Sequence, residues 1–327
     1  MEHRKIGDSD LSLSVITFGA WAAGGWMWGG TERKVAVEAI KAAYDAGITS
    51  IDTAPIYGQG TSESIVGEAI KGISRDKVQI LTKFGMRWDL AKGDLAMHSK
   101  DNSGKEIDIY KYAGKESVIY ECEQSLKRLG TDYIDLYQLH WPETVTPIEE
   151  TFEAVSELIK QGKVRHASVC NCSTSQIEAA NKSCNIISDQ LPYSMLNRKI
   201  EKDIIPYCIK NKKSILAYSP MERGLLTGKI KPDHKFGEGD ARRDMEMYQP
   251  DSIKRIDDFL AKIKPIADEQ GATLAQLVLK WTAEQPGITI ALAGARNSDQ
   301  AKQNAKAAEV KISKEQMDFI DTELAKL

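Results

Sequence analysis

The stretch Ile48-Thr-Ser-Ile-Asp-Thr-Ala-Pro-Ile-Tyr57 shows the pattern that decides the fold: a short β-branched apolar run followed at once by polar residues. Similar runs recur along the chain, and segments with helical periodicity separate them. The predicted strands begin at Val15, Ile48, Val78, Tyr133, Val164, Ile186, Ser214 and Ile288. Eight alternating strand and helix units in about 300 residues favour an α/β fold, a (β/α)8 TIM barrel, over an open doubly wound sheet.

Signals at the element ends support this alternation. Three segments, Thr146-Pro-Ile-Glu149, Ser173-Thr-Ser-Gln176 and Thr273-Leu-Ala-Gln276, have the form of a capping box at a helix start. Ahead of the first barrel strand, Arg4-Lys-Ile and Leu11-Ser-Leu flank a turn sequence at 7–10. This pattern predicts an N-terminal β-hairpin, which would close the bottom of a barrel.

Two connections are longer than the others. Residues 85–114, after the third strand, and residues 220–250, after the seventh, are polar and contain glycines. Loops of this length inside a compact domain are usually functional lids or disordered insertions. Because we find no linker and no internal repeat, we expect residues 1–327 to form a single barrel domain with two long top-face loops.

Composition excludes several classes of partner. The 327 residues include 44 basic and 47 acidic side chains, a formal net charge of −3, which gives no footprint for nucleic acid or for a membrane surface. No stretch approaches the ~20 apolar residues that span a bilayer. The five cysteines match neither a disulfide framework nor a zinc site, so we expect reduced thiols, no metal and a cytoplasmic location.

Four residues with reactive side chains follow consecutive predicted strands. Asp52, Lys83 and His140 stand after the second, third and fourth strands, and Tyr57 lies in the second loop. In a (β/α)8 barrel the carboxyl ends of the strands meet on one face, about 4.8 Å from neighbour to neighbour. A lysine ammonium held by an aspartate beside a tyrosine makes the phenol proton available to a carbonyl oxygen. We therefore expect these side chains to form one catalytic site.

The tryptophans predict a pocket near this site. Most of them fall in loops after the first, third and fourth strands, whereas core packing would spread them among helices and strands. Gathered on one face, they predict an aromatic wall that excludes water from a small substrate, and the alternative is that they pack the long loops together. The predicted substrate pocket consists of Trp21, Trp28, Tyr57, Trp88, His140 and Trp141.

These motifs resemble the aldo-keto reductase family over residues 3–310. Asp52-Thr-Ala-Pro-Ile-Tyr57-Gly58, Lys83 and Leu139-His-Trp-Pro142 carry the resemblance, together with 217–229 and 292–304. The loop at 24–30 is similar to that of the bacterial branch with inositol-utilisation and general-stress reductases. The resemblance implies hydride transfer between a nicotinamide dinucleotide and a small carbonyl substrate. Tyr57 would donate the proton, with Lys83 moving its pKa from ~10 towards ~7 and His140 holding the substrate oxygen.

The resemblance also implies where the cofactor lies. Asn171 and Gln190 would hold the carboxamide, Tyr218 would stack on the nicotinamide, and Arg296 would bind a 2′-phosphate, which favours NADP (NADPH) over NAD. Cys170 stands where many members of the family have a serine, which removes a hydroxyl hydrogen bond to the carboxamide. Gly294 and Gln300 stand where the phosphate clamp of the family has Lys and Arg, so NAD is the alternative cofactor. The implied cofactor contacts are Gly19, Ala20, Trp21, Asp52, Asn171, Gln190, Tyr218, Ser219, Pro220, Met221, Gly224, Leu225, Lys229, Gly294, Arg296, Gln300 and Asn304.

Two other functions stay open at this point. Lys83 at a strand end is where the lysine of a Schiff-base aldolase or isomerase would project. Barrels of the resembled family also serve as cofactor-binding regulatory subunits of membrane channels, with little turnover. The sequence leaves open the physiological substrate, the direction of the reaction and whether the protein is a monomer or a weak homo-oligomer.

Overall fold

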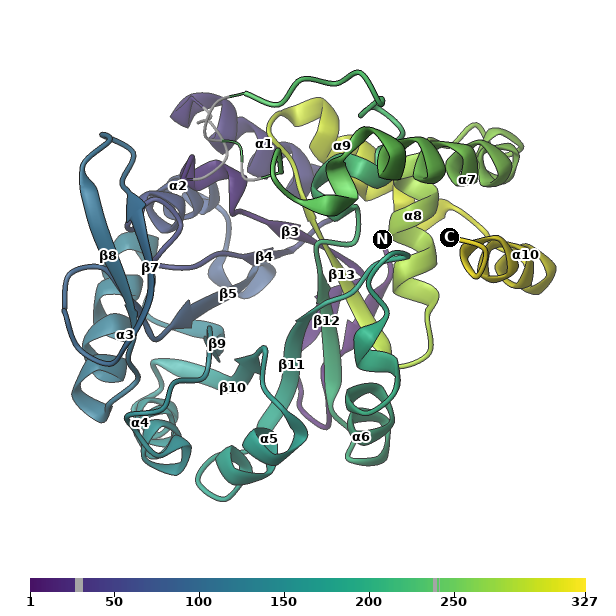
Figure 1. The fold of residues 1–327 in the computed structure, drawn as a ribbon. Coiled ribbons are helices and arrows are strands. Elements are labelled where there is room, and N and C mark those ends of the chain that lie inside the picture. The colour runs from purple at the N-terminus through teal and green to yellow at the C-terminus, as the bar shows by residue number, and fades with distance from the viewer. Residues whose placement is uncertain (27–31, 238–239, 241) are drawn as a thin grey trace.

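A closed barrel of parallel strands forms the centre of the protein, in the spatial order β10-β11-β12-β13-β3-β4-β5-β9 (Figure 1). The computed structural model describes residues 1–26, 32–237, 240 and 242–327. The barrel strands are β3 (Ile16–Gly19), β4 (Ser50–Asp52), β5 (Gln79–Phe84), β9 (Ile134–Leu139), β10 (Val164–Cys170), β11 (Ile186–Pro192), β12 (Ser214–Tyr218) and β13 (Ile288–Gly294). Each predicted strand is a barrel strand, which confirms the (β/α)8 prediction.

Helices alternate with these strands and surround the barrel (Figure 1). They are α1 (Arg33–Asp45), α2 (Thr61–Ile70), α3 (Lys115–Leu129), α4 (Ile148–Lys160), α5 (Thr174–Asn181), α6 (Ile204–Lys210), α7 (Pro250–Asp268), α8 (Leu274–Glu284), α9 (Ser298–Lys306) and α10 (Lys314–Leu324). Short 3-10 turns are η1 (Ala22–Gly24), η2 (Arg75–Lys77), η3 (Lys199–Glu201), η4 (Glu222–Thr227), η5 (Glu246–Tyr248) and η6 (Ala307–Glu309). The α7 and α10 helices pack together outside the main ring, beside α8.

Helix starts follow the predicted signals in two of three cases. Ser173 and Thr273 form complete capping boxes at α5 and α8, as predicted. The predicted capping box at Thr146 is wrong, because α4 begins after Pro147 and has no side-chain cap. The Glu143 carboxylate instead accepts the backbone N–H of Thr146 at 3.0 Å. The turn before the helix is therefore stabilised by a residue that precedes it in the chain.

The N-terminal hairpin closes the end of the barrel at which the strands begin. Its strands β1 (His3–Lys5) and β2 (Ser12–Ser14) pair antiparallel, and the backbone N–H of Ser14 donates to the hydroxyl of Ser50 at the start of β4. The hairpin contributes buried apolar side chains to the cluster inside the barrel. That cluster consists of Ile6, Leu11, Leu13, Leu81, Leu136, Ile187, Leu216, Ile290 and Leu292. The predicted hairpin is confirmed, and it keeps water out of the barrel from below.

Strand alternation carries side chains from this apolar layer to the opposite end of the barrel. Side chains two residues apart on a strand point to the same face. Lys83 and Gln138 therefore follow Leu81 and Leu136 on the inner face of β5 and β9. Lys83 and Gln138 are also register partners across the two strands. A polar layer thus lies directly above the apolar one.

Residues 86–111 form a second sheet on the outside of the barrel, at the left of Figure 1. Its strands are β6 (Met86–Arg87), β7 (Asp94–Lys100) and β8 (Glu106–Lys111), in the order β6-β8-β7. Trp26 Nε1 donates to Ser99 Oγ at 3.1 Å, and Asn102 Nδ2 donates to the Gly24 carbonyl at 2.8 Å. The long loop predicted here is therefore an ordered β-ribbon joined to the loop after β3.

The second long connection is attached to the turn after β12. Arg242 forms an ion pair with Asp240 at 2.7 Å and donates from Nη1 to the Arg223 carbonyl at 3.0 Å. The Tyr248 hydroxyl donates to the Glu222 carbonyl at 2.9 Å. In its described residues this segment packs on η4.

The hairpin should contribute measurably to stability. Leu13→Ala should lower the free energy of unfolding by about 2–5 kcal/mol, because it leaves a cavity at a fully buried position between hairpin and strands. Leu95 on β7 is 48% exposed, so Leu95→Ala should change that free energy by less than ~0.5 kcal/mol. Denaturant unfolding measures both variants. An equal, small effect at both positions would contradict the role of the hairpin.

Candidate active site

A buried ion pair between Lys83 and Asp52 lies at the centre of the site. Lys83 Nζ lies 2.6 Å from Asp52 Oδ1, with 1% and 6% of the two side chains exposed. The ammonium also donates to the Thr53 carbonyl at 3.0 Å and to the hydroxyl of Tyr57 at 3.2 Å. Burial alone would lower the pKa of Lys83, but Asp52, Tyr57 and Cys170 together outweigh burial and hold this pKa above its ordinary value. Lys83 is therefore a fixed cation at neutral pH.

Tyr57 reaches this cation because its loop follows a tight path. Gly58 has φ +68°, and a Cβ there would lie 2.2 Å from the Gly24 carbonyl oxygen. A Cβ on Gly24 would in turn lie 2.4 Å from the carbonyl oxygen of Tyr57. Only glycine fits such backbone contact. The two glycines lock the loop after β3 onto the loop after β4 and hold Tyr57 over the end of β5.

The pKa of Tyr57 differs from the lowered value that the sequence analysis predicted. Burial raises the pKa of Tyr57 to about 12, since the lowering by Lys83 is offset by the negative charge of Asp52. The expectation that Lys83 would move this pKa towards ~7 is therefore wrong for the site as it stands. Asp52 neutralises the cation that was expected to acidify the phenol. The phenol of Tyr57 therefore stays protonated throughout the physiological range.

His140 and Trp21 border Tyr57 on two sides. The ring of His140 meets that of Tyr57 edge-on, with centroids 5.7 Å apart and an interplanar angle of 82°. Trp21 stacks on Tyr57 with centroids 5.9 Å apart. Burial first, and then the charge of Lys83, hold the pKa of His140 well below its ordinary value. His140 is a neutral imidazole, able to donate a hydrogen bond without adding charge.

Gln138 is a buried member of the site that the sequence analysis did not identify. Its Nε2 donates to Asp52 Oδ2 at 3.0 Å, and Gln190 Nε2 donates to the same oxygen at 2.8 Å. Both carboxylate oxygens of Asp52 are therefore occupied. The sequence signal that could have identified it is its spacing. Gln138 lies two residues after Leu136 and two before His140, so a strand places all three side chains on the same, inner face.

The amides predicted to hold a carboxamide lie at neighbouring strand ends. Asn171 follows β10 with a left-handed backbone, φ +59°, and its N–H donates to the Gln190 carbonyl at 3.2 Å. Asn171 Nδ2 donates to the His140 carbonyl at 3.1 Å, and its Oδ1 accepts from the Tyr218 hydroxyl at 3.0 Å. Donor and acceptor groups from two amides, beside a tyrosine ring, fit the carboxamide end of a nicotinamide.

The other predicted cofactor residues lie around the ends of β3, β12 and β13. Gly19 and Gly294 are register partners, and Ala20 donates its N–H to the Asp52 carbonyl at 2.8 Å. Asn304 Nδ2 donates to the Gly294 carbonyl at 3.0 Å, and Gln300 Oε1 accepts the N–H of Arg296 at 2.9 Å. The side chains of Asn304 and Gln300 thus shape the turn before α9. Asn297 caps this helix, because its side-chain oxygen accepts the N–H of Gln300 at 2.9 Å.

The turn after β12 carries the remaining predicted contacts. Ser219, Glu222 and Arg223 have positive φ values of 56°, 43° and 46°, and Gly224 follows at 96°. These backbone angles tighten the turn, in which the N–H of Glu222 donates to the Ser219 carbonyl at 2.9 Å and that of Gly224 to the Met221 carbonyl at 3.0 Å. Leu225 is buried, whereas Lys229 is exposed at the end of the turn. The members of this turn that were predicted are Ser219, Pro220, Met221, Gly224, Leu225 and Lys229.

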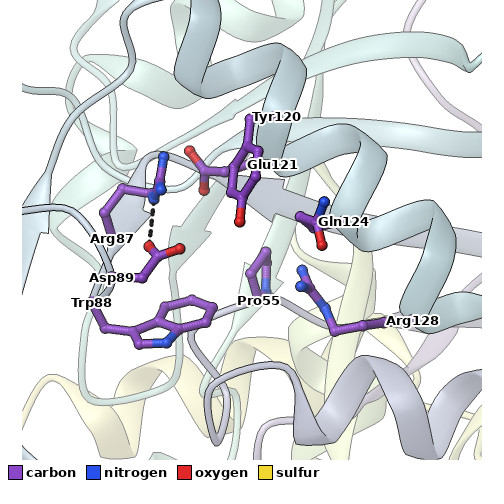
Figure 2. A pocket seen from close by; sticks show the side chains of 8 residues that line it. All are labelled: Pro55, Arg87, Trp88, Asp89, Tyr120, Glu121, Gln124 and Arg128. Atoms are coloured by element: carbon purple, nitrogen blue, oxygen red, sulfur yellow. Dashed lines mark hydrogen bonds and ion pairs between the residues drawn. The ribbon is translucent and has the colours of Figure 1, made fainter.

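The predicted aromatic wall is only partly gathered around Tyr57. Trp21 stacks on it, but Trp141 is 40% exposed, and Trp28 lies outside the described residues. Trp88 borders a small separate cavity between the β4–α2 loop and α3 (Figure 2). The residues lining that cavity are Pro55, Arg87, Trp88, Asp89, Tyr120, Glu121, Gln124 and Arg128. None of the four predicted catalytic residues is among them.

Fold and geometry together bring the four predicted catalytic residues into one cluster at the mouth of a (β/α)8 barrel. Among the described residues there is no group of three His, Cys, Asp or Glu side chains arranged to hold a metal ion. In the same part of the chain, no helix has the length and apolar character needed to cross a membrane.

Comparisons with known proteins identify the family. The sequence profile of the aldo/keto reductase family matches residues 15–324. The chain is 39% identical to the aldo-keto reductase YhdN of Bacillus subtilis over 302 residues, 92% of this chain and 86% of that protein. It is 35% identical to the NADH-specific methylglyoxal reductase of Escherichia coli over 318 residues, 96% and 95% of the two chains. The chain belongs to the aldo/keto reductase family, and it is an oxidoreductase of carbonyl compounds.

Solved structures agree with this assignment. The glycerol dehydrogenase AKR11B4 of Gluconobacter oxydans superimposes with a TM-score of 0.89 at 33% identity, covering 99% of this chain and 95% of that one. An aldo/keto reductase of Klebsiella pneumoniae in complex with NADP and acetate has a TM-score of 0.72 at 28% identity, covering 98% and 94%.

Glu121, which lines the cavity in Figure 2, makes the free energy of unfolding depend on pH. Burial raises the pKa of Glu121 to about 7, while Arg87 and the Gly85 N–H lower it in part. The native protein therefore holds this proton more tightly than the unfolded chain, and stability falls as pH rises from about 4.5 to 7. Glu121→Gln should reduce the loss of unfolding free energy between about pH 5 and 8 by about 2–3 kcal/mol.

Denaturant unfolding at the two pH values measures this effect. Glu123→Gln is the matched control, since Glu123 is an exposed residue of the same helix. A Glu121 variant with the wild-type pH dependence would show that Glu121 is ionised in the native state.

Proposed function

We propose that this protein reduces an aldehyde, a ketone or a sugar-like carbonyl to the alcohol with NADPH, and that Tyr57 donates the proton. The observation that carries the proposal is the contact of Lys83 Nζ with both Asp52, at 2.6 Å, and the Tyr57 hydroxyl, at 3.2 Å. The edge of the His140 ring lies against the same tyrosine. A carbonyl oxygen placed between Tyr57 and His140 would meet two hydrogen-bond donors.

The raised pKa of Tyr57 suits an acid that gives up its proton only after hydride has reached the carbonyl carbon. When bound, a nicotinamide dinucleotide would supply hydride to the carbonyl carbon. The carbonyl oxygen then becomes nearly as basic as hydroxide, whose conjugate acid has a pKa of about 15.7. A phenol with a pKa of about 12 transfers its proton to such an oxygen readily, although it holds the proton against water. Lys83 stabilises the phenolate that remains.

His140 and Asp52 have supporting roles in this proposal. His140 donates a hydrogen bond to the substrate oxygen as a neutral imidazole, so it does not compete with Tyr57 as an acid. Asp52 keeps Lys83 charged and fixed in direction. Removal of either interaction would leave the developing charge poorly stabilised.

We infer NADPH as the preferred cofactor, with NADH as the alternative. Arg296 is exposed at the start of α9, where the helix N-terminus and its guanidinium both favour a 2′-phosphate. The Klebsiella pneumoniae relative binds NADP, whereas the Escherichia coli relative is NADH-specific. Asn171 and Gln190 would hold the carboxamide and Tyr218 would stack on the ring. Fluorescence titration with the two reduced cofactors, followed by a panel of carbonyl substrates, tests this choice.

The other two functions are less well supported. A Schiff-base lysine must be uncharged to attack a carbonyl, whereas Lys83 donates to three oxygen atoms and is held as an ammonium. A regulatory subunit would bind the cofactor tightly with negligible turnover. The same titration and substrate panel distinguish that outcome from catalysis.

Substitution of the proton donor tests the proposal directly. Tyr57→Phe should lower kcat for reduction by about 10²–10⁴-fold, because the phenol proton is lost, and should leave the Kd for NADPH nearly unchanged. Tyr133→Phe removes another tyrosine hydroxyl, one that bonds to the Arg75 carbonyl, and should leave kcat unchanged. Steady-state kinetics and fluorescence titration measure both variants. A Tyr57→Phe enzyme with most of its activity would refute the assigned donor.

The pH dependence of the two reaction directions should differ. Because the pKa of Tyr57 is about 12, the phenol stays protonated and kcat for carbonyl reduction should be flat between about pH 6 and 9. Oxidation of the matching alcohol needs the phenolate, so its kcat should rise with pH over the same range. Stopped-flow or steady-state pH profiles measure this. A tenfold fall of reduction between about pH 7 and 9 would instead indicate an acidic Tyr57.

A further inference from the structure

We propose that Gln138 is a positioning residue: together with Asp52 it holds both amide hydrogens of Gln190, so that the side-chain oxygen of Gln190, and not its NH2 group, faces the carboxamide of the cofactor. The inference rests on the proposed function. It concerns a residue that lies inside the barrel and touches neither substrate nor cofactor in that proposal.

Gln138 occupies the polar layer inside the barrel. It is fully buried, and it is the register partner of Lys83 on the neighbouring strand. Its Nε2 donates to Asp52 Oδ2 at 3.0 Å, and its Oε1 accepts from Gln190 Nε2 at 3.3 Å. One side chain thus bridges the catalytic carboxylate and a predicted cofactor ligand.

Hydrogen-bond accounting fixes the orientation of Gln190. A carboxylate only accepts, so the amide group that faces Asp52 must be NH2. Gln190 Nε2 donates one hydrogen to Asp52 Oδ2 at 2.8 Å and the other to Gln138 Oε1 at 3.3 Å. Both of its amide hydrogens are therefore used, and only its carbonyl oxygen is left to meet a ligand. Without Gln138, one amide hydrogen of Gln190 is released, and the amide is held by its single bond to Asp52.

Asn171 offers the opposite group. Its Oδ1 accepts from the Tyr218 hydroxyl, and its Nδ2 donates one hydrogen to the His140 carbonyl. One N–H of Asn171 remains available. A donor on Asn171 and an acceptor on Gln190 match a primary carboxamide, which has a carbonyl oxygen and an NH2 group. The geometry therefore selects a ring that carries an unsubstituted amide.

Gln138 also acts on the catalytic pair. Together with Gln190, it occupies Asp52 Oδ2, so that Oδ1 is left for Lys83. Loss of one of the two amides would let the carboxylate rotate and would weaken the hold on Lys83. A defect in the rate of the chemical step should accompany the change in cofactor recognition.

An analogue of the cofactor tests the inference. In the acetylpyridine analogue of NADP, an acetyl group replaces the carboxamide and the NH2 donor is lost. The wild-type enzyme should bind NADP about tenfold more tightly than this analogue, since the Gln190 oxygen loses its partner. In Gln138→Leu, the amide of Gln190 is held by Asp52 alone and its oxygen is less firmly placed to accept the carboxamide NH2, so the ratio of the two Kd values should fall to about twofold or less. The kcat with NADPH should fall about tenfold.

Two further variants separate positioning from a general loss of structure. Gln138→Met keeps the length of the side chain and should reproduce both effects even where the shorter leucine disturbs folding. Gln285→Leu is the matched control, because Gln285 is buried, its Nε2 has no partner in the described chain and it is remote from the network. That control should retain the wild-type ratio.

The outcomes are distinct. Equal weakening of NADP and analogue in both Gln138 variants, with an unchanged ratio of the two Kd values, would overturn the inference while leaving the proposed function intact. A wild-type protein that binds neither NADP nor NADPH would refute the proposed function itself.

Discussion

The site depends on one constraint: a lysine ammonium buried at the mouth of the barrel must be matched by an anion and by hydrogen-bond acceptors. Lys83 meets this requirement with Asp52, the Thr53 carbonyl and the Tyr57 hydroxyl. Removal of a charge from water costs several kcal/mol, so an incomplete set of partners would be strongly unfavourable. The position of Tyr57 is therefore coupled to the packing of β4 and β5.

The same constraint extends across the barrel. Asp52 needs donors for its second oxygen, and Gln138 and Gln190 provide them from β9 and β11. The apolar cluster shared by the hairpin and the strands lies beneath this polar layer and keeps it dry. Hydrogen bonds in such surroundings are stronger than in water. Asp52, Gln138 and Gln190 thus hold the ammonium of Lys83 in a fixed position beside the hydroxyl of Tyr57.

Sequence patterns predicted most of this framework but not its electrostatics. The strands and the hairpin are local features, encoded in apolar runs and turn residues, and Asp52, Lys83 and His140 could be placed from strand ends alone. Gln138 was missed because a glutamine inside a strand gains meaning only when the closed barrel shows which way it faces. The pKa of Tyr57 depends on burial and on the distance to Asp52, and neither can be read from spacing. The sheet at 86–111 was missed although β8 alternates Ile107 and Ile109 with polar residues, because its partner β7 is exposed along most of its length and lacks a buried apolar face.

The β-ribbon formed by β6, β7 and β8 stands apart from this framework. It is joined to the first loop through Trp26–Ser99 and Asn102–Gly24, whereas the four reactive side chains come from β4, β5, β9 and the loop after β4. None of these four side chains is carried by the ribbon. A ribbon of different length or composition could therefore replace this one without any change to the elements that hold the buried ion pair and the tyrosine.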